Sequence, residues 1–193
     1  MIKAVINNLE DFINKPLDKD ALATALQEII PSNIRNYNVV FFCVGTDRST
    51  GDSLGPLVGS FLKNKGYNNV IGTLEDTVNG ENICERLKEI PNNKTVIVID
   101  STLSDKRFVG NYFVNNSGLK PGAGVGKLLP AIGDFYIAGA VTFSGPLAHH
   151  ILQTTKLSLV IKMAEDITEA IETRFSSMKR MDCSKDNSWK IVR

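Results

Sequence analysis

The sequence contains few cysteines and histidines, and its net charge is close to zero. Each of these features argues against a class of function. Only three cysteines and two histidines occur among 193 residues. Cys43, Cys84 and Cys183 show no Cys-x-x-Cys spacing, so neither a disulfide framework nor a thiolate zinc site is indicated. The formal net charge is +1, which provides no long-range attraction to nucleic acids or anionic membranes. We therefore expect no nucleic-acid and no membrane partner.

Long hydrophobic runs and linkers are also missing. No apolar run approaches the roughly 18 residues that a membrane-spanning helix needs. The first stretch carries Glu10, Asp11 and Asp18, whereas a secretion signal would be basic and then apolar. These features predict a cytoplasmic protein. No segment rich in proline, glycine and serine divides the chain, so residues 1–193 are predicted to form a single domain.

Apolar patterns of two kinds alternate along the chain. Continuous runs rich in β-branched and aromatic residues predict buried strands, and repeats at spacings of three and four predict helices. The predicted strands are 39–44, 70–74, 95–100, 108–114 and 135–141. Helices are predicted at 2–13, 22–30, 83–90 and 157–171, and a further helix is predicted to begin near Gly55. Because parallel strands need a crossover that a helix supplies, this alternation predicts an α/β fold with a parallel sheet.

The two ends of the chain are predicted to differ from its centre. Residues 1–33 form a helical extension that either covers the sheet or presents a surface to another subunit or partner. Residues 178–193 form a polar C-terminal tail without an assigned function. The sequence does not choose between the two roles of the extension.

Aspartates follow the predicted strands at positions that suggest a site. Asp52 lies just before a helix that Pro56 helps to start, where an isolated aspartate is most simply a helix cap. Asp100 ends the strand 95–100, and Glu75-Asp76 follows the strand 70–74. Since parallel strands end at one edge of the sheet, we expect these acidic positions to gather there.

A pair of facing carboxylates suits either of two chemistries. Like charges close together raise one pKa, so that Asp52 and Asp100 could share a proton and activate a water. The same oxygens could instead bind a divalent ion. Asp47 and Arg48, in the loop before Asp52, either pair with each other or contact a substrate. A serine–histidine dyad is less favoured, because the two histidines are adjacent and at most one could face a site.

A glycine-rich segment, 119–127, lies between two predicted strands. Gly122, Gly124 and Gly126 permit unusual backbone conformations or close approach to a ligand. As a phosphate-binding loop the match is weak, since no Gly-Lys-Ser/Thr follows. An ordinary connection and a functional loop are about equally compatible with the pattern.

Three segments together strongly resemble the YyaC-type sporulation proteins of spore-forming Firmicutes. They are Gly45–Pro56, Val98–Ser101 and Lys120–Lys127, and the resemblance covers about residues 37–162. That family is similar in turn to the germination protease that degrades small acid-soluble spore proteins and, more distantly, to the hydrogenase maturation endopeptidases. The resemblance implies a three-layer sandwich, with a central mixed, mainly parallel sheet and helices on both faces.

The resemblance also implies an activity and its residues. In the germination protease one aspartate precedes a Leu-Gly-Pro turn and a second ends a strand; Asp52 and Asp100 match these positions. Its Pro-Gly-x-Gly-Val-Gly loop is matched by 121–126. The hydrogenase endopeptidases add a histidine that binds nickel in the substrate, and no histidine stands in a comparable motif here. The implied function is an aspartate-dependent endopeptidase, without metal or cofactor, that cleaves spore proteins in the forespore or mother cell.

We predict that Asp52 and Asp100 are catalytic and that Asp47, Arg48, Asp76, Gly122, Gly124 and Gly126 bind substrate, a peptide or protein. Two other functions stay open. One is a non-catalytic spore protein that binds a peptide or partner in a protease-like pocket. The other is a hydrolase or phosphorylase of nucleoside-like substrates, supported only by the glycine-rich segment. Homo-oligomerisation is compatible with each.

Overall fold

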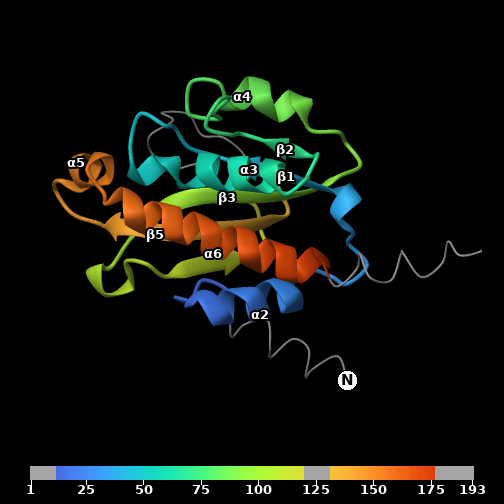
Figure 1. Ribbon diagram of the computed structural model, residues 1–193, viewed down its shortest axis with the longest axis horizontal. Coiled ribbons are helices and arrows are strands. Elements are labelled where there is room, and N and C mark those ends of the chain that lie inside the picture. The colour runs from blue at the N-terminus through green and yellow to red at the C-terminus, as the bar shows by residue number, and fades with distance from the viewer. Residues whose placement is uncertain (1–11, 120–130, 177–193) are drawn as a thin grey trace, which may run out of the picture.

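The computed structural model describes residues 12–119 and 131–176 (Figure 1). A five-stranded sheet forms the centre of this part, in the order β2-β1-β3-β5-β4. The first four of these strands are parallel, and β4 is antiparallel to β5. The strands are β1 (Val39–Cys43), β2 (Val70–Ile71), β3 (Thr95–Ser104), β4 (Tyr112–Asn115) and β5 (Phe135–Phe143). The predicted mixed, mainly parallel α/β fold is confirmed.

Helices lie on both faces of the sheet. Figure 1 shows α3 and α6 across one face of the sheet, with α2 beside α6. Helix α4 lies next to β2, and its Ile83 packs against the opposite face. The α-helices are α2 (Lys19–Ile29), α3 (Leu54–Asn64), α4 (Ile83–Arg86), α5 (Ala148–Gln153) and α6 (Leu157–Ser176). Short 3-10 turns are η1 (Asn36–Asn38), η2 (Gly51–Ser53), η3 (Leu87–Glu89) and η4 (Lys106–Phe108).

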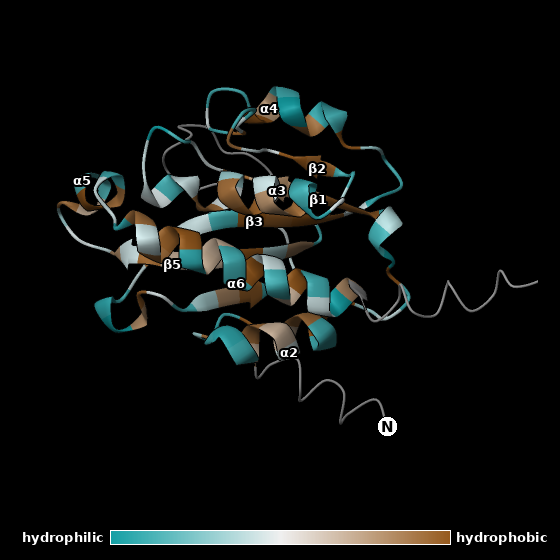
Figure 2. Ribbon diagram, in the orientation of Figure 1, coloured by the Kyte–Doolittle hydropathy of each residue, from teal (hydrophilic) through white to brown (hydrophobic). Residues whose placement is uncertain are grey.

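The sheet separates two groups of buried apolar side chains. The larger group joins one face of β1, β3 and β5 to the apolar stripes of α2, α3 and α6. The smaller group covers the opposite face and includes Phe42, Val98 and Ile83 of α4. All five residues of β1 are buried, as expected for a strand covered on both faces. Figure 2 shows these strands as hydrophobic, and the long helices as hydrophobic on one side only.

Helix α2 belongs to this core. Its apolar residues, Leu22, Ala25, Leu26 and Ile29, are all buried, and α2 packs against α6 and β4. Of the two roles that the sequence left open for this helix, the structure therefore shows that it covers the sheet. Residues 12–17 run beside β4, with Ile13 bridged to Val114 and Leu17 to Tyr112.

A buried arginine fixes the end of α2 to α6. Arg174 is 4% exposed, and its Nη2 donates to the carbonyl oxygens of Ile30 at 3.1 Å and Pro31 at 2.7 Å. These carbonyls follow α2, where helix backbone acceptors have no partner within the helix. The arginine thus supplies a hydrogen bond to the buried carbonyl of Ile30 and a second one, partly buried, to that of Pro31.

We expect Arg174→Met to lower the free energy of unfolding by about 2–3 kcal/mol, because it removes two hydrogen bonds from a charged donor and leaves the buried carbonyl of Ile30 unpaired. Urea denaturation measures this loss. Arg107→Met is the control, since Arg107 is exposed and its ion pair with Asp105 lies in solvent; its effect should be within about 0.5 kcal/mol. Equal losses in the two variants would contradict the anchoring role of Arg174.

Several predicted boundaries differ from the structure. The strand predicted at 70–74 ends at Ile71, because Gly72 adopts φ +95° and turns the chain. The strand predicted at 108–114 is shortened to β4 by the η4 turn. Phe12 and Ile13 are not helical, and residues 1–11 and the tail 178–193 lie outside the described residues. Helix α5 was not predicted at all.

Candidate functional site

The loop between β1 and α3 is held close by glycines. Gly45 has φ +146°, and a Cβ there would lie 2.0 Å from the backbone oxygen of Asp52. A Cβ on Gly55 would lie 2.0 Å from the backbone oxygen of Val44. Thr46 N–H donates to the Asp52 carbonyl at 3.1 Å. The end of β1 and the start of α3 therefore touch through their backbones, which fixes the position of Asp52.

Asp52 lies in η2, directly before α3, as the sequence predicted. Its side chain does not cap that helix: among the described residues its hydrogen-bond partner is Ser101, whose hydroxyl donates to Asp52 Oδ1 at 3.4 Å. The capping explanation for this residue is therefore wrong. The N-terminal end of α3 still favours negative charge at this position through its aligned peptide dipoles.

Asp100 lies inside β3 and does not end it, which corrects the predicted boundary. Strand β3 continues to Ser104, paired with β5. On its other side β1 pairs only as far as Ile99, so Asp100 is the first residue of β3 beyond the end of β1. Its Oδ1 accepts the backbone N–H of Ser101 at 2.7 Å. The carboxyl group is therefore turned toward the place where β1 has ended.

Both aspartates line one cavity of about 530 Å³ at the carboxyl ends of β1 and β3. Twelve residues form its wall: Val44, Gly45, Thr46, Asp52, Asn79, Gly80, Asp100, Ser101, Thr102, Leu103, His149 and Leu152. They come from the loops after β1 and β2, from the second half of β3 and from α5. The predicted gathering of Asp52 and Asp100 at this edge of the sheet is what the structure shows.

The two carboxyl groups differ in their surroundings. Burial, opposed by the Ser101 N–H and assisted by the nearby charge of Asp52, raises the pKa of Asp100 to about 8. Burial, and then the charge of Asp100, also raises the pKa of the Tyr136 hydroxyl on β5 above its usual range. This raised pKa favours the protonated form of the Asp100 carboxyl at neutral pH.

This raised pKa predicts that Asp100→Asn stabilises the protein at alkaline pH. In the unfolded chain the carboxyl titrates near pH 4, so between about pH 4 and 8 the folded state binds more protons. Stability then falls as pH rises through this range. An amide does not titrate, so the melting temperature of the variant should exceed that of the wild type by more at pH 9 than at pH 5. Thermal unfolding at both values measures this; a constant difference would contradict it.

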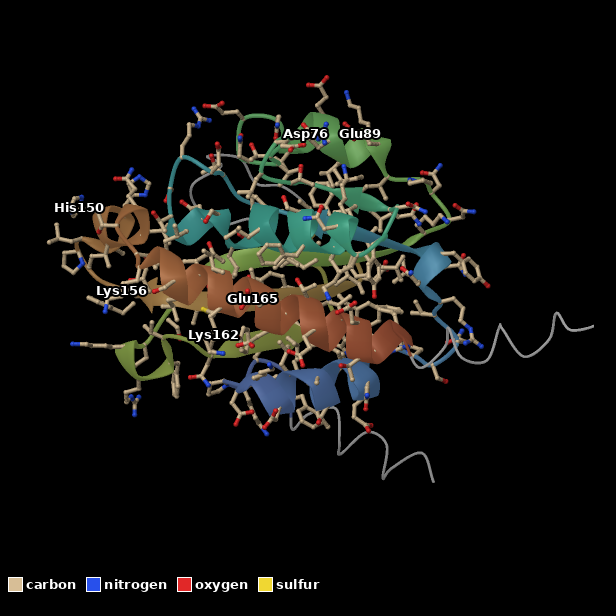
Figure 3. All side chains as sticks on the ribbon, in the orientation of Figure 1. Asp76, Glu89, His150, Lys156, Lys162 and Glu165 are labelled. Atoms are coloured by element: carbon tan, nitrogen blue, oxygen red, sulfur yellow. The ribbon has the colours of Figure 1, made fainter. Side chains whose placement is uncertain are left out.

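Other predicted site residues lie apart from this cavity. Asp47 and Arg48 are exposed and outside its wall, and Arg48 pairs with Glu81 at 3.6 Å instead of with Asp47. Asp76 also lies outside it, with Oδ2 2.6 Å from Nη2 of Arg86. Figure 3 shows Asp76 with Glu89, a second partner of Arg86, on the α4 side of the molecule. The structure thus does not bring Asp76 to the aspartate pair. Gly122, Gly124 and Gly126 lie outside the described residues.

Sequence reasoning missed five polar residues of the cavity wall, Thr46, Asn79, Ser101, Thr102 and His149. Ser101 contacts both aspartates, through its hydroxyl and its N–H. His149 lines the cavity from α5, whereas His150 points outward from the same helix (Figure 3). The adjacency of the histidines had indicated that at most one faces a site. The sequence carried no clear signal for this helix, because none of its residues is buried.

Two negative findings concern residues 12–119 and 131–176 only. No group of three histidine, cysteine or acidic side chains there is arranged to hold a metal ion. None of the helices in these ranges is long and apolar enough to cross a membrane.

The sheet order and the cavity at the strand ends define an α/β protein with a mixed, mainly parallel sheet. The structure is similar to that of the [NiFe] hydrogenase maturation protease HycI from Thermococcus kodakarensis KOD1, with a TM-score of 0.50 and 17% sequence identity. The similarity covers 77% of this chain and 97% of that chain. At this level of identity the likeness concerns the fold.

The chain itself belongs to the family described as protein of unknown function DUF1256, which matches residues 12–170. It is 42% identical over 159 residues to the uncharacterized protein YyaC of Bacillus subtilis (strain 168), covering 78% of each protein. The resemblance to the YyaC type is confirmed. The family match also begins before α2, earlier than residue 37, where the sequence motifs placed it.

Proposed function

We propose that this protein is an aspartate-dependent endopeptidase that hydrolyses peptide bonds of spore proteins within a sporulating cell. The observation that carries the proposal is the placement of Asp52 and Asp100 on the wall of one cavity. Burial raises the pKa of Asp100 to about 8, which suits this residue to act as an acid. The fold shared with a maturation protease is compatible with it. The resemblance of the sequence to the sporulation and germination proteins supports the cellular setting.

The two carboxyl groups have complementary tasks in this proposal. Asp52, at the N-terminal end of α3, is the charged member and takes a proton from a water as that water attacks the peptide carbonyl. Asp100 is the protonated member and donates to the reacting amide, whose nitrogen leaves as an amine. Ser101 keeps the pair in place, because its hydroxyl bonds to Asp52 and its N–H to Asp100. A role of Gly122–Gly126 in binding the carbonyl oxygen stays a prediction.

The test is to incubate the purified protein with extracts of spore coat and core proteins and to identify new peptide termini by mass spectrometry. The Asp52→Asn variant, which keeps the size and hydrogen-bonding capacity of the side chain, is incubated in parallel. Cleavages made by the wild type and absent with the variant support the proposal. Identical termini in both samples would overturn it, and tight peptide binding without cleavage would then favour the non-catalytic binding protein.

A further inference from the structure

Among the described residues, the second half of β3 has a partner strand on one side only. Strand β1 pairs with β3 from Thr95 to Ile99, whereas β5 pairs with it as far as Ser104. After β1 the chain turns away from β3, since Gly45 N–H donates to the carbonyl of Val78 at 2.7 Å. Within the described residues, 100–104 therefore form a free edge. Four of these five residues line the cavity of the aspartates.

The backbone groups that face this edge can be identified from two hydrogen bonds. The Ile99 carbonyl accepts the N–H of Val44 at 2.8 Å, on the β1 side. The Ser104 carbonyl accepts the N–H of Ser144 at 2.9 Å, on the β5 side. Backbone groups of successive residues in a strand point to opposite sides. The register of β3 and β5 shifts between Thr102 and Leu103, but the extra residue, Val141, lies in β5, so the alternation along β3 continues. The N–H and C=O groups of Ser101 and Leu103 therefore point to the free edge.

Two of these four groups are already bonded locally. The N–H of Ser101 donates to Asp100 Oδ1 at 2.7 Å, and the carbonyl of Leu103 accepts the Thr102 hydroxyl at 3.3 Å. The carbonyl of Ser101 and the N–H of Leu103 have no hydrogen-bond partner across the edge in the described part of the chain. In a parallel pair of strands, one residue of the neighbouring strand donates its N–H to one carbonyl and accepts the N–H of the residue two positions further along. The Ser101 carbonyl and the Leu103 N–H have this spacing. Antiparallel pairing would need both groups of one residue.

We propose that this edge binds the substrate as an additional parallel strand, with one peptide residue bonded to the Ser101 carbonyl and the Leu103 N–H. The inference rests on the proposed peptidase function and names its substrate class as an extended peptide segment recognised through its backbone. Strand addition of this kind gives affinity from main-chain hydrogen bonds. Leu103, 38% exposed, leaves room at this edge.

The geometry also fixes which side of the cleaved bond is held. Strand β1 occupies the edge of β3 up to Ile99, so a parallel peptide can follow β3 only from about Asp100 onward. The peptide chain before the anchored residue then leaves the sheet beside Asp100, where both aspartates line the cavity. The anchored residue accordingly lies on the C-terminal side of the bond that is cleaved, within one or two residues of it.

Two variants at one position isolate the backbone contact. Leu103→Pro and Leu103→Ala both lack the leucine side chain, but only proline lacks the N–H, and sheets tolerate proline where the N–H faces a free edge. With a mixture of synthetic unstructured decapeptides as substrate, kcat/KM of the proline variant should be about 5- to 10-fold below that of the alanine variant, the effect of one lost hydrogen bond. Equal values, with cleavage by both, would overturn the inference and leave the peptidase proposal intact.

A second measurement decides the inference even where the proline variant does not fold or no peptide is cleaved. Amide hydrogen exchange of Leu103 is followed in Asp100→Asn with and without the same decapeptides. Slower exchange with peptide supports strand addition. Exchange that is unchanged by peptide, or already slow without it because the chain itself covers the edge, would overturn it. Absence of cleavage by the wild type, in contrast, counts against the proposed function alone.

Discussion

Replacing Asp100 by asparagine is expected to reduce peptide cleavage by at least about 10³-fold, within the range that general acid–base groups contribute. Asparagine keeps the acceptor for the Ser101 N–H, so the local structure is retained. It has no acidic proton to give to the departing amine. Because the same variant is expected to be more stable than the wild type at alkaline pH, loss of activity and loss of folding are separable in one protein.

The pH dependence of the wild type provides an independent measurement of the same role. If Asp100 acts in its protonated form, kcat/KM should fall as pH rises through about 8, where its carboxyl loses the proton. Asp105→Asn is the matched control, since Asp105 follows the same strand but is exposed and paired with Arg107; its rate should equal that of the wild type. A rate that rises above pH 8 would contradict the assignment of Asp100 as the acid.

Gly55→Ala is expected to produce the largest loss of stability, about 3 kcal/mol, because its methyl group would overlap the carbonyl oxygen of Val44. The distance from that oxygen would be 2.0 Å. Val44 cannot move aside freely, since its N–H is bonded to β3 and the residue is bridged to Val78. At about 2–4 °C for each kcal/mol, the melting temperature should fall by about 6–12 °C.

The position of Gly55 makes this variant informative about the site as well. The displacement separates the end of β1 from the start of α3, and Asp52 lies between them, so cleavage should fall together with stability. Gly145→Ala is the control, because a methyl group there would meet only a Phe143 ring carbon, at 4.0 Å. A melting temperature of Gly55→Ala equal to that of Gly145→Ala would show that this contact does not hold the loop.

Much of the fold could be predicted because its strands are buried on both faces. Such strands appear as continuous apolar runs, as in Val39–Cys43 and the first half of β3. Local breaks were harder to predict. The strand at Val70 stops after two residues because Gly72 turns the chain against Cys43, and this close approach joins segments far apart in sequence. Helix α5 has no buried residue, so its pattern gave no clear signal.

The sequence by itself determined the α/β class, the strand, loop and helix around Asp52, and the choice of Asp52 and Asp100. These features depend on local spacing and on the rule that parallel strands end together. Only the tertiary structure decided that burial raises the pKa of Asp100, that Asp76 pairs with Arg86 away from the site, and that Ser101 joins the two aspartates. Burial, ion pairing and free strand edges depend on neighbours distant in the chain, and spacing along the sequence does not contain them.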